Sequence, residues 1–148
     1  MYDDWGANGL VVAATAAAVG ACVLLHYEGL ALASRALARM AGHRRIKVLY
    51  GIGSVLVLHV LEIWMFGLAL WLLLLLSPAS GALGPGALHV FDIVYFSAVT
   101  FTTVGFGDLV PSGPIRFLCG MEALTGFVLI GWSASFTFLE MERFWRNP

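Results

Sequence analysis

Charged residues are scarce in this chain. Only 11% of its 148 residues are Asp, Glu, Lys or Arg, whereas soluble domains carry about 25%. Apolar residues make up 60% of the chain, and its mean hydropathy is +0.89. This balance excludes a water-soluble globular domain and predicts an all-α membrane protein. The formal net charge of -1 offers no basic surface, so we expect no nucleic-acid partner.

Several motifs of other protein classes are missing. The two cysteines, Cys22 and Cys119, lie inside apolar runs, which predicts free buried thiols and not a disulfide. No apolar run carries arginine at every third position, so a voltage sensor is excluded. No lysine follows the glycines at residues 105–107, which argues against a phosphate-binding loop. We therefore expect neither an enzyme nor a cofactor.

What the sequence does contain is three long apolar runs. A helix needs about 20 residues to cross about 30 Å of hydrocarbon at 1.5 Å per residue. Each run is close to that length or longer, so we expect three transmembrane helices, at residues 9–27, 48–76 and 115–138.

Residues 28–42, between the first two runs, have a different pattern. Apolar residues recur there at helical spacing, while Glu28, Arg35 and Arg39 gather on the opposite side. This periodicity predicts a separate amphipathic helix at the membrane surface. Its apolar positions are Leu30, Ala33, Leu37 and Met40.

The placement of basic residues predicts the orientation. Seven of the eight Lys and Arg residues lie between the first and second runs or after the third, and Arg116 is the exception. Lys and Arg favour the cytoplasmic side. We therefore expect a multi-pass protein of the cell membrane, with its N-terminus outside, its C-terminus in the cytoplasm and residues 77–114 outside.

Residues 91–114 are too short to cross the membrane twice and too apolar for an ordinary loop. A re-entrant hairpin fits, because non-helical backbone at membrane depth survives where protein or a wet cavity encloses it. We expect a descending helix at 91–102 and an extended return at 103–107, here called the filter segment. Rings of carbonyl oxygens can replace the water around a potassium ion, and Gly105 and Gly107 permit the unusual dihedral angles.

Residues 102–108, with the sequence TTVGFGD, resemble the signature of the potassium channel family. Their flanks look like its outer, pore and inner helices, so the resemblance implies a pore module at 48–148. Residues 1–47, with the first helix and the surface helix, resemble the additions of small three-span bacterial members. The resemblance also implies a fourfold homotetramer with K⁺ bound by Thr103, Val104, Gly105 and Phe106.

The resemblance assigns further roles around the filter segment. Thr103 would add a hydroxyl ring at the inner mouth, and Asp108 negative charge at the outer mouth. The side chains of Val104 and Phe106 are expected to pack against the descending helix. Val99 stands where some bacterial members carry a carboxyl group that pairs with the aspartate after the filter. Tyr95 is expected to donate a hydrogen bond from its hydroxyl to that aspartate instead. Thr102 is expected to support the filter segment as well, and Gly107 is the last of its ion-binding residues.

Apart from Arg116 at the start of the third run, three charged or imidazole side chains fall inside the second and third apolar runs. His59 and Glu62 are one helical turn apart, and Glu122 is in the third run. Isolated charge in hydrocarbon is costly, so we expect the three to form a buried polar cluster behind the filter. Two interpretations stay open, a permanently hydrogen-bonded structural cluster and a proton-sensing group.

The third run carries candidate gating residues. Gly126 is next to the usual hinge of the family's inner helix, although close helix packing explains a glycine equally well. Gly131, Ser135 and Leu139 recur at about one helical turn and are expected to line the inner cavity, with the bulky Phe136 beside them.

These patterns predict a passive potassium-selective channel without a voltage sensor. A weakly selective cation channel and a non-conducting scaffold or sensor subunit are the alternatives. We expect membrane lipids and other copies of the chain as partners, leave open a separate regulatory subunit, and expect no cytosolic ligand-binding domain after residue 138.

Overall fold

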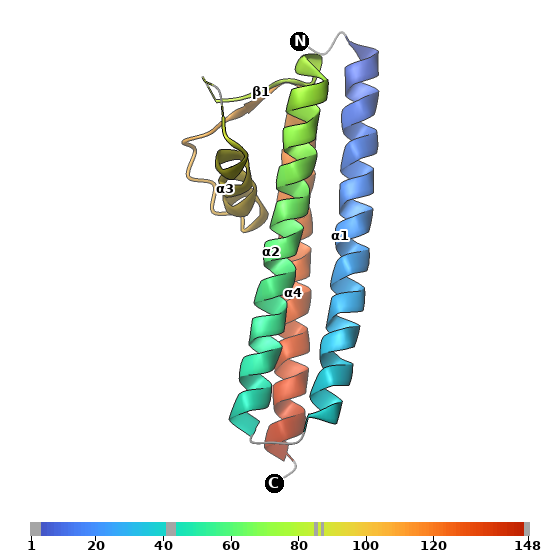
Figure 1. The fold of residues 1–148 in the computed structure, drawn as a ribbon, viewed down its shortest axis with the longest axis vertical. Helices are drawn as coiled ribbons and strands as arrows, with labels where there is room; N and C mark the ends of the chain where they lie inside the picture. The colour runs from blue at the N-terminus through green and yellow to red at the C-terminus, as the bar shows by residue number, and fades with distance from the viewer. Residues whose placement is uncertain (1–3, 41–43, 85, 87, 147–148) are drawn as a thin grey trace.

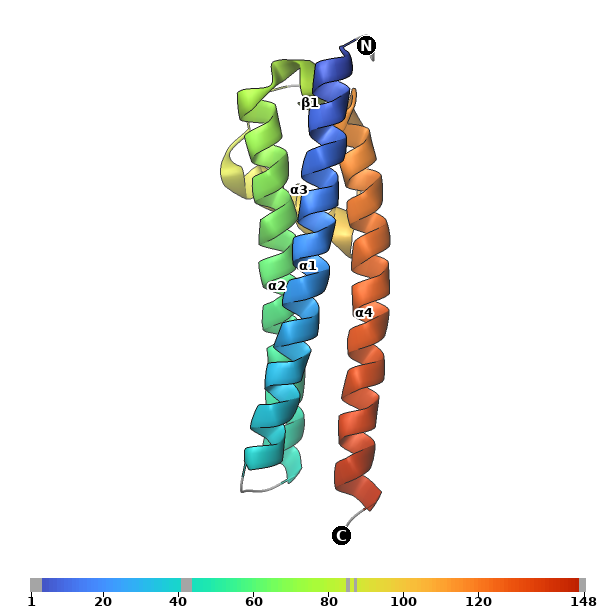
Figure 2. The ribbon, with the colours of Figure 1, turned by 90° about the vertical axis from the view of Figure 1, so that its right-hand side faces the viewer.

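Three long helices lie side by side in the computed structural model, which describes residues 4–40, 44–84, 86 and 88–146. They are α1 (Trp5–Arg39), α2 (Arg44–Leu76) and α4 (Ile115–Arg146). Helices α1 and α4 run in one direction and α2 in the other, so α1 begins and α4 ends at opposite ends of the molecule (Figure 1). Helix α1 contacts both α2 and α4 along their length (Figure 2).

The short helix α3 (Val90–Phe101) packs on α2 and α4. It lies on the face of these two helices opposite to α1 (Figures 1 and 2). The residues after Phe101 return without helical structure, which confirms the expected hairpin to within one residue. The short helix η1 (Pro78–Ser80) and strand β1 (Ala82–Leu83) precede α3.

A two-stranded sheet closes the hairpin. Strand β1 pairs antiparallel with β2 (Pro111–Ser112), with Ala82 opposite Ser112 and Leu83 opposite Pro111. The pairing joins the chain before α3 to the chain after the filter segment. Helix α3 and the filter segment therefore form one closed unit on the side of the bundle.

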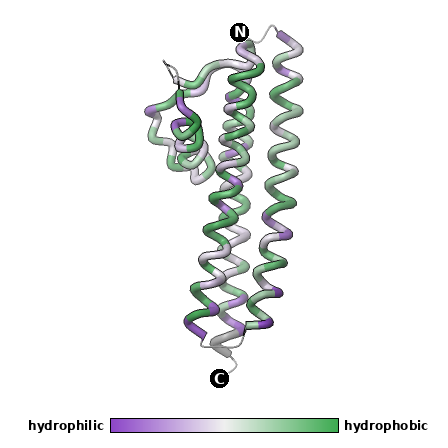
Figure 3. Tube along the Cα trace, viewed as in Figure 1, coloured by the Kyte–Doolittle hydropathy of each residue, from purple (hydrophilic) through white to green (hydrophobic). Residues whose placement is uncertain are grey.

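The three long helices are each long and apolar enough to cross a membrane. Apolar residues run along their middle portions, and hydrophilic residues gather toward the ends of the bundle (Figure 3). Many large apolar side chains on their outer faces are exposed, including Leu56, Val57 and Leu61 of α2. An exposed apolar surface on this scale suits lipid and not water, as expected for an all-α membrane protein.

The expected break after residue 27 is wrong, because α1 continues as one helix to Arg39. Its buried residues recur every three or four positions from Ala7 to Leu37, so the apolar positions of residues 28–42 continue the stripe of the first run. This lower part packs on the other helices: Leu37 lies against Gly51, and the Ser34 hydroxyl donates to Glu140 at 3.1 Å. Gly42 and His43 lie outside the described residues.

The ends of the other two spans also differ from the prediction. Helix α2 begins at Arg44, before the expected residue 48, and α4 continues beyond residue 138 to Arg146. Polar residues at these ends had suggested shorter helices. A helix can extend past the hydrocarbon because its main-chain hydrogen bonds are internal, so charged residues mark a change of surroundings and not a helix end.

The end of α3 approaches α4 closely at Gly126. A Cβ atom built on this glycine would overlap the main-chain carbonyl of Phe101. The ring of Phe101 is fully buried and lies 6.4 Å from the ring of Phe66 in α2. The absence of a side chain at residue 126 therefore sets the position of the last turn of α3, where the filter segment begins.

Substituting Gly126 with alanine should lower the melting temperature of the protein. The new Cβ must displace the main chain of Phe101, and overpacking of this kind costs about 1–3 kcal/mol. Gly120 on the same helix is the matched control, because nothing lies within 4 Å of its Cβ position and alanine there gains about 1 kcal/mol of helix propensity. Thermal unfolding of the two variants in detergent measures the difference. Equal melting temperatures would contradict the close approach.

Candidate ion-conducting site

The filter segment has an alternating backbone. Thr103, Gly105 and Gly107 have φ angles of 60°, 54° and 79°, while Val104 and Phe106 between them do not have positive φ. Thr103 is the one non-glycine residue with positive φ in the described chain, a conformation that side chains disfavour. Alternation of this kind turns successive carbonyl groups toward the same side of the chain. The segment can thus present a row of main-chain oxygens.

Hydrogen bonds tie the start of this row to α3. The Thr102 hydroxyl donates to the Ala98 carbonyl at 2.7 Å, and the Thr103 amide donates to the Thr100 carbonyl at 2.9 Å. The Gly105 amide donates to the carbonyl of Val99 at 3.1 Å. The amides of Thr103 and Gly105 are therefore used on the helix side, and the carbonyl oxygens of the segment can face the other side.

The side chains of the filter segment do not pack as expected. Val104 is 54% exposed and Phe106 is 69% exposed, so the prediction that they pack against the descending helix is wrong within one chain. The described part of this chain leaves more than half of each side chain uncovered. A large exposed apolar surface beside a polar backbone marks a surface for assembly.

A hollow of about 440 Å³ lies below the filter segment, toward the end of the bundle where α4 ends. Its walls come from α4 and the start of the filter segment: Thr102, Thr103, Phe127, Val128, Ile130 and Gly131. Gly131 therefore shares a space with Thr103, as expected for an inner cavity. Phe127 and Val128 were missed in the sequence, because one apolar residue in an apolar helix gives no signal of its own.

The remaining cavity candidates lie further along α4. Ser135 and Leu139 are exposed, and the Ser135 hydroxyl donates to the Gly131 carbonyl at 3.1 Å. Phe136 lines a different hollow, between α1 and α4 beside Tyr27, so the structure turns it toward α1. Helix α4 passes through Gly126 without interruption, and a hinge there stays a prediction.

At the outer end, Tyr95 contacts Asp108. The Tyr95 hydroxyl donates to the Asp108 carboxylate at 2.8 Å, which confirms the predicted bond across the back of the filter segment. This bond raises the pKa of Tyr95 above its usual value of about 10, because the carboxylate beside it disfavours a phenolate. The tyrosine therefore keeps its proton, and the bond its donor, throughout the neutral range.

The predicted cluster of His59, Glu62 and Glu122 is two groups in the structure. Glu122 is fully buried beside the hydroxyl of Ser97 in α3, and this hydroxyl also lies 2.8 Å from the Ile63 carbonyl in α2. One hydroxyl carries one hydrogen, so both contacts are hydrogen bonds only when the Glu122 carboxyl carries a proton. This group joins α2, α3 and α4 behind the filter segment.

The second group contains His59, Glu62 and a residue that the sequence prediction missed, His26. The expected end of the first helix at residue 27 had placed His26 in its last turn, away from any partner. The spacing of His26 could have indicated its burial, because it lies one helical turn after Cys22, and both are buried residues of α1. The response of these residues to protons stays a prediction.

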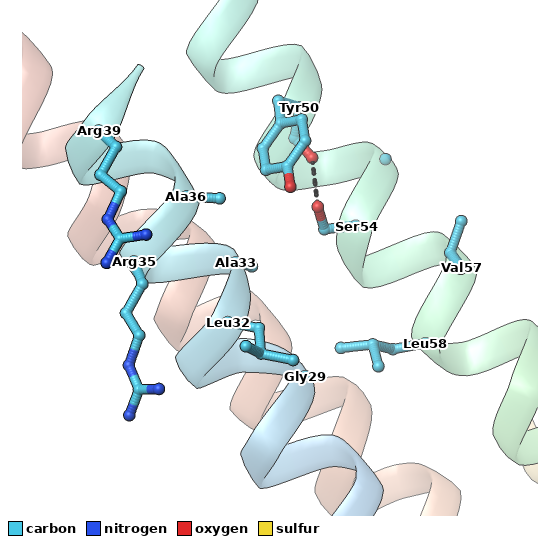
Figure 4. Close-up of a pocket in the computed structure, with 11 residues that line it drawn as sticks. Gly29, Leu32, Ala33, Arg35, Ala36, Arg39, Tyr50, Ser54, Val57 and Leu58 are labelled. Carbon is cyan, nitrogen blue, oxygen red and sulfur yellow. Dashed lines mark hydrogen bonds between the residues drawn. The ribbon is translucent and has the colours of Figure 1, made fainter.

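One further hollow, of about 820 Å³, lies between α1 and α2 near the end of the bundle where α1 ends (Figure 4). The two helices are in contact where Gly29 meets Leu58 and again where Leu37 lies against Gly51. Arg35 and Arg39 extend from α1 beside it, and its other walls are largely apolar. It brings no set of reactive groups together and does not border the filter segment.

Comparisons with known proteins agree with this geometry. The chain matches the family described as Ion channel over residues 46–143, which includes α3, the filter segment and most of the two helices around them. It is 51% identical over 43 residues to two-pore potassium channel 1 of Arabidopsis thaliana, a region covering 28% of this chain and 12% of that protein. The chain thus matches a small part of that relative. No solved structure matches it.

The family match covers well over half of the chain and contains the whole hairpin described above. Ion channels are passive conduits, so this match also separates the protein from enzymes. A multi-pass arrangement follows from the three apolar helices. The chain belongs to the ion channel family.

Proposed function

We propose that this protein is a potassium-selective channel without a voltage sensor, built from four copies of the chain. The observation that carries the proposal is the alternation of positive φ at Thr103, Gly105 and Gly107. Four such segments around an axis would form stacked rings of carbonyl oxygens. These rings would replace the hydration shell of K⁺ at Thr103, Val104, Gly105 and Phe106.

The exposed side chains support assembly around an axis. One filter segment offers oxygens on one side only, so an ion is enclosed only when other copies complete the ring. Val104 and Phe106 leave apolar surface for a neighbouring copy to cover, and Phe127 on α4 is 69% exposed. The number four comes from the resemblance to potassium channels, and the identity with a plant protein named as a potassium channel agrees with this ion.

Two alternatives give different results in one assay. The purified protein is placed alone in liposomes under opposed potassium and sodium gradients. A potassium-selective channel sets the reversal potential near that of potassium, whereas a weakly selective cation channel sets it near zero. A scaffold or sensor subunit conducts no ions.

Substituting Gly105 with alanine should reduce the permeability ratio of potassium to sodium about tenfold or more. Alanine at φ 54° carries strain of about 1–3 kcal/mol, and relief of that strain turns a carbonyl group out of its ring. Gly120→Ala is the control, because that position is open and lies outside the filter segment. An unchanged permeability ratio in Gly105→Ala would overturn the carbonyl-filter proposal.

Substituting Tyr95 with phenylalanine should shorten the time that the channel stays conductive, by about three- to tenfold, without changing its selectivity. The change removes only the hydroxyl that holds Asp108, so the outer end of the filter segment loses a support and keeps its carbonyl groups. Single-channel recording measures open times and permeability in the same variant. Because the Tyr95 pKa is raised, the ratio of open times between wild type and Tyr95→Phe should not change between about pH 7 and 9. Open times equal to wild type in Tyr95→Phe would remove the proposed support.

We further propose that α1 begins on the outer side and α4 ends in the cytoplasm. This orientation places seven of the eight Lys and Arg residues on the cytoplasmic side, as the positive-inside rule requires. It also places Tyr95, Asp108 and the strands of the two-stranded sheet on the outer side.

Cysteine labelling of intact cells tests the orientation. An impermeant thiol reagent should react with Asp3→Cys from outside and with Asn147→Cys only after the membrane is opened. The native Cys22 and Cys119 are buried, so wild-type labelling gives the background. Reaction of Asn147→Cys but not Asp3→Cys from outside would reverse the assignment.

A further inference from the structure

Three ionisable side chains meet between α1 and α2. The His26 Nδ1 atom lies 2.8 Å from Oε1 of Glu62, and the His59 Nδ1 atom lies 2.8 Å from Oε2 of the same carboxyl group. The side chains of His26 and Glu62 are completely buried, and that of His59 is 15% exposed. We call these residues the His–Glu–His group.

This group requires a positive charge. In the described part of the chain, the ion pairs of Glu62 are with the two histidines, and neither Lys nor Arg contacts it. Neutral imidazoles do not cancel the charge of a carboxylate. A net negative charge at this depth of a membrane helix costs several kcal/mol. The group therefore has to hold either a metal ion or a proton, on an imidazole or on the carboxyl group itself.

The donor set suits a metal ion. Each of the three residues offers one ligand atom, and these atoms all lie within 4.8 Å of one another. Two imidazole nitrogens and one carboxylate oxygen form a ligand set that binds Zn²⁺ and related divalent ions. His59 and Glu62 are three residues apart on one face of α2, and His26 faces them from α1, so three ligands come from two rigid helices.

Neighbouring residues hold these ligands in place. Ser133 of α4 has its hydroxyl 3.3 Å from Nε2 of His26, and a partner on the second ring nitrogen is typical of metal-binding histidines. The ring of Trp132 packs on the same imidazole at 5.3 Å. Cys22 precedes His26 by one turn in the buried stripe of α1, and its Sγ atom lies 3.9 Å from the main-chain carbonyl of Glu62. This contact holds α1 against α2 beside the group.

From this geometry we infer that His26, His59 and Glu62 bind one divalent transition-metal ion of the zinc class. The ion supplies the charge that Glu62 requires and links α1 to the helix that supports the filter segment. The ring of His59 lies 5.8 Å from that of Phe101, the last residue of α3. A metal ion at the group would therefore fix the contact between α1 and the end of the pore helix. Nothing in potassium selectivity depends on this inference.

Metal titration of the full-length protein in detergent tests the inference. Protein stripped with a chelator should bind about one Co²⁺ or Zn²⁺ ion per chain, with a Kd of about 1 μM or lower. Bound Co²⁺ should show the intense visible absorption of a four-coordinate site, and Zn²⁺ should displace it. Elemental analysis after dialysis gives the stoichiometry independently.

Variants locate the site. Glu62→Gln and His26→Gln should each weaken Co²⁺ binding at least about tenfold, because each removes one ligand. His26→Cys, which offers a sulfur ligand in the same place, should retain binding. Glu122→Gln removes a buried carboxyl group outside the site, and His89→Asn removes an imidazole at the start of α3, so both should bind Co²⁺ like wild type.

The wild-type spectrum decides the question even where a variant fails to fold. Wild-type protein that binds no Co²⁺ at 100 times the expected Kd would overturn the inference, and the group would then carry a proton only. Binding of Co²⁺ by Glu62→Gln as tight as in wild type would also overturn it, by placing the metal elsewhere. Potassium flux from liposomes is measured on the same samples, so failure of the metal site is distinguished from failure of the channel.

Discussion

Main-chain N–H and C=O groups have no water to bond inside a membrane, and the filter segment breaks the helical pattern that would satisfy them internally. The surrounding structure supplies hydrogen-bond partners to this segment. The last turn of α3 accepts hydrogen bonds from the amides of Thr103 and Gly105, and the pairing of β1 with β2 closes the chain around the segment. In the proposed channel, the carbonyl oxygens of the segment have an ion as their partner. Under the proposed assembly, the same constraint makes one copy of the chain an incomplete ion site.

Buried polar side chains follow the same logic between the helices. The Ser97 hydroxyl connects α3 to both neighbours through Ile63 and Glu122, and Glu62 is enclosed by two imidazoles from two helices. In lipid the hydrophobic effect does not hold apolar helices together, so small residues and polar contacts contribute much of the specificity. In this protein such contacts occur where the hairpin and α1 pack against α2 and α4.

The sequence predicted the elements whose signals are local. Length and hydropathy were enough for the three spans and for the hairpin, and the family resemblance of residues 102–108 led to the bond between Tyr95 and Asp108. Contacts between distant residues were not predictable in this way. His26 joins Glu62 across 36 positions, and only the packing of α1 against α2 brings them together. The surface helix was predicted wrongly because a stripe packed on protein and a stripe packed on lipid headgroups have the same period.

The position of His26 also bears on how the protein is made. Ribosomes deliver α1 to the membrane before α2, so the imidazole is already in the bilayer when the carboxyl group of Glu62 arrives. The acidic residue in the second helix costs about 3 kcal/mol at that depth, and a partner already in the bilayer lowers this cost. The first helix can thus act as an insertion partner for the second during synthesis. The insertion of α2, which packs against the pore helix, would then be assisted by a helix that lies away from the filter segment.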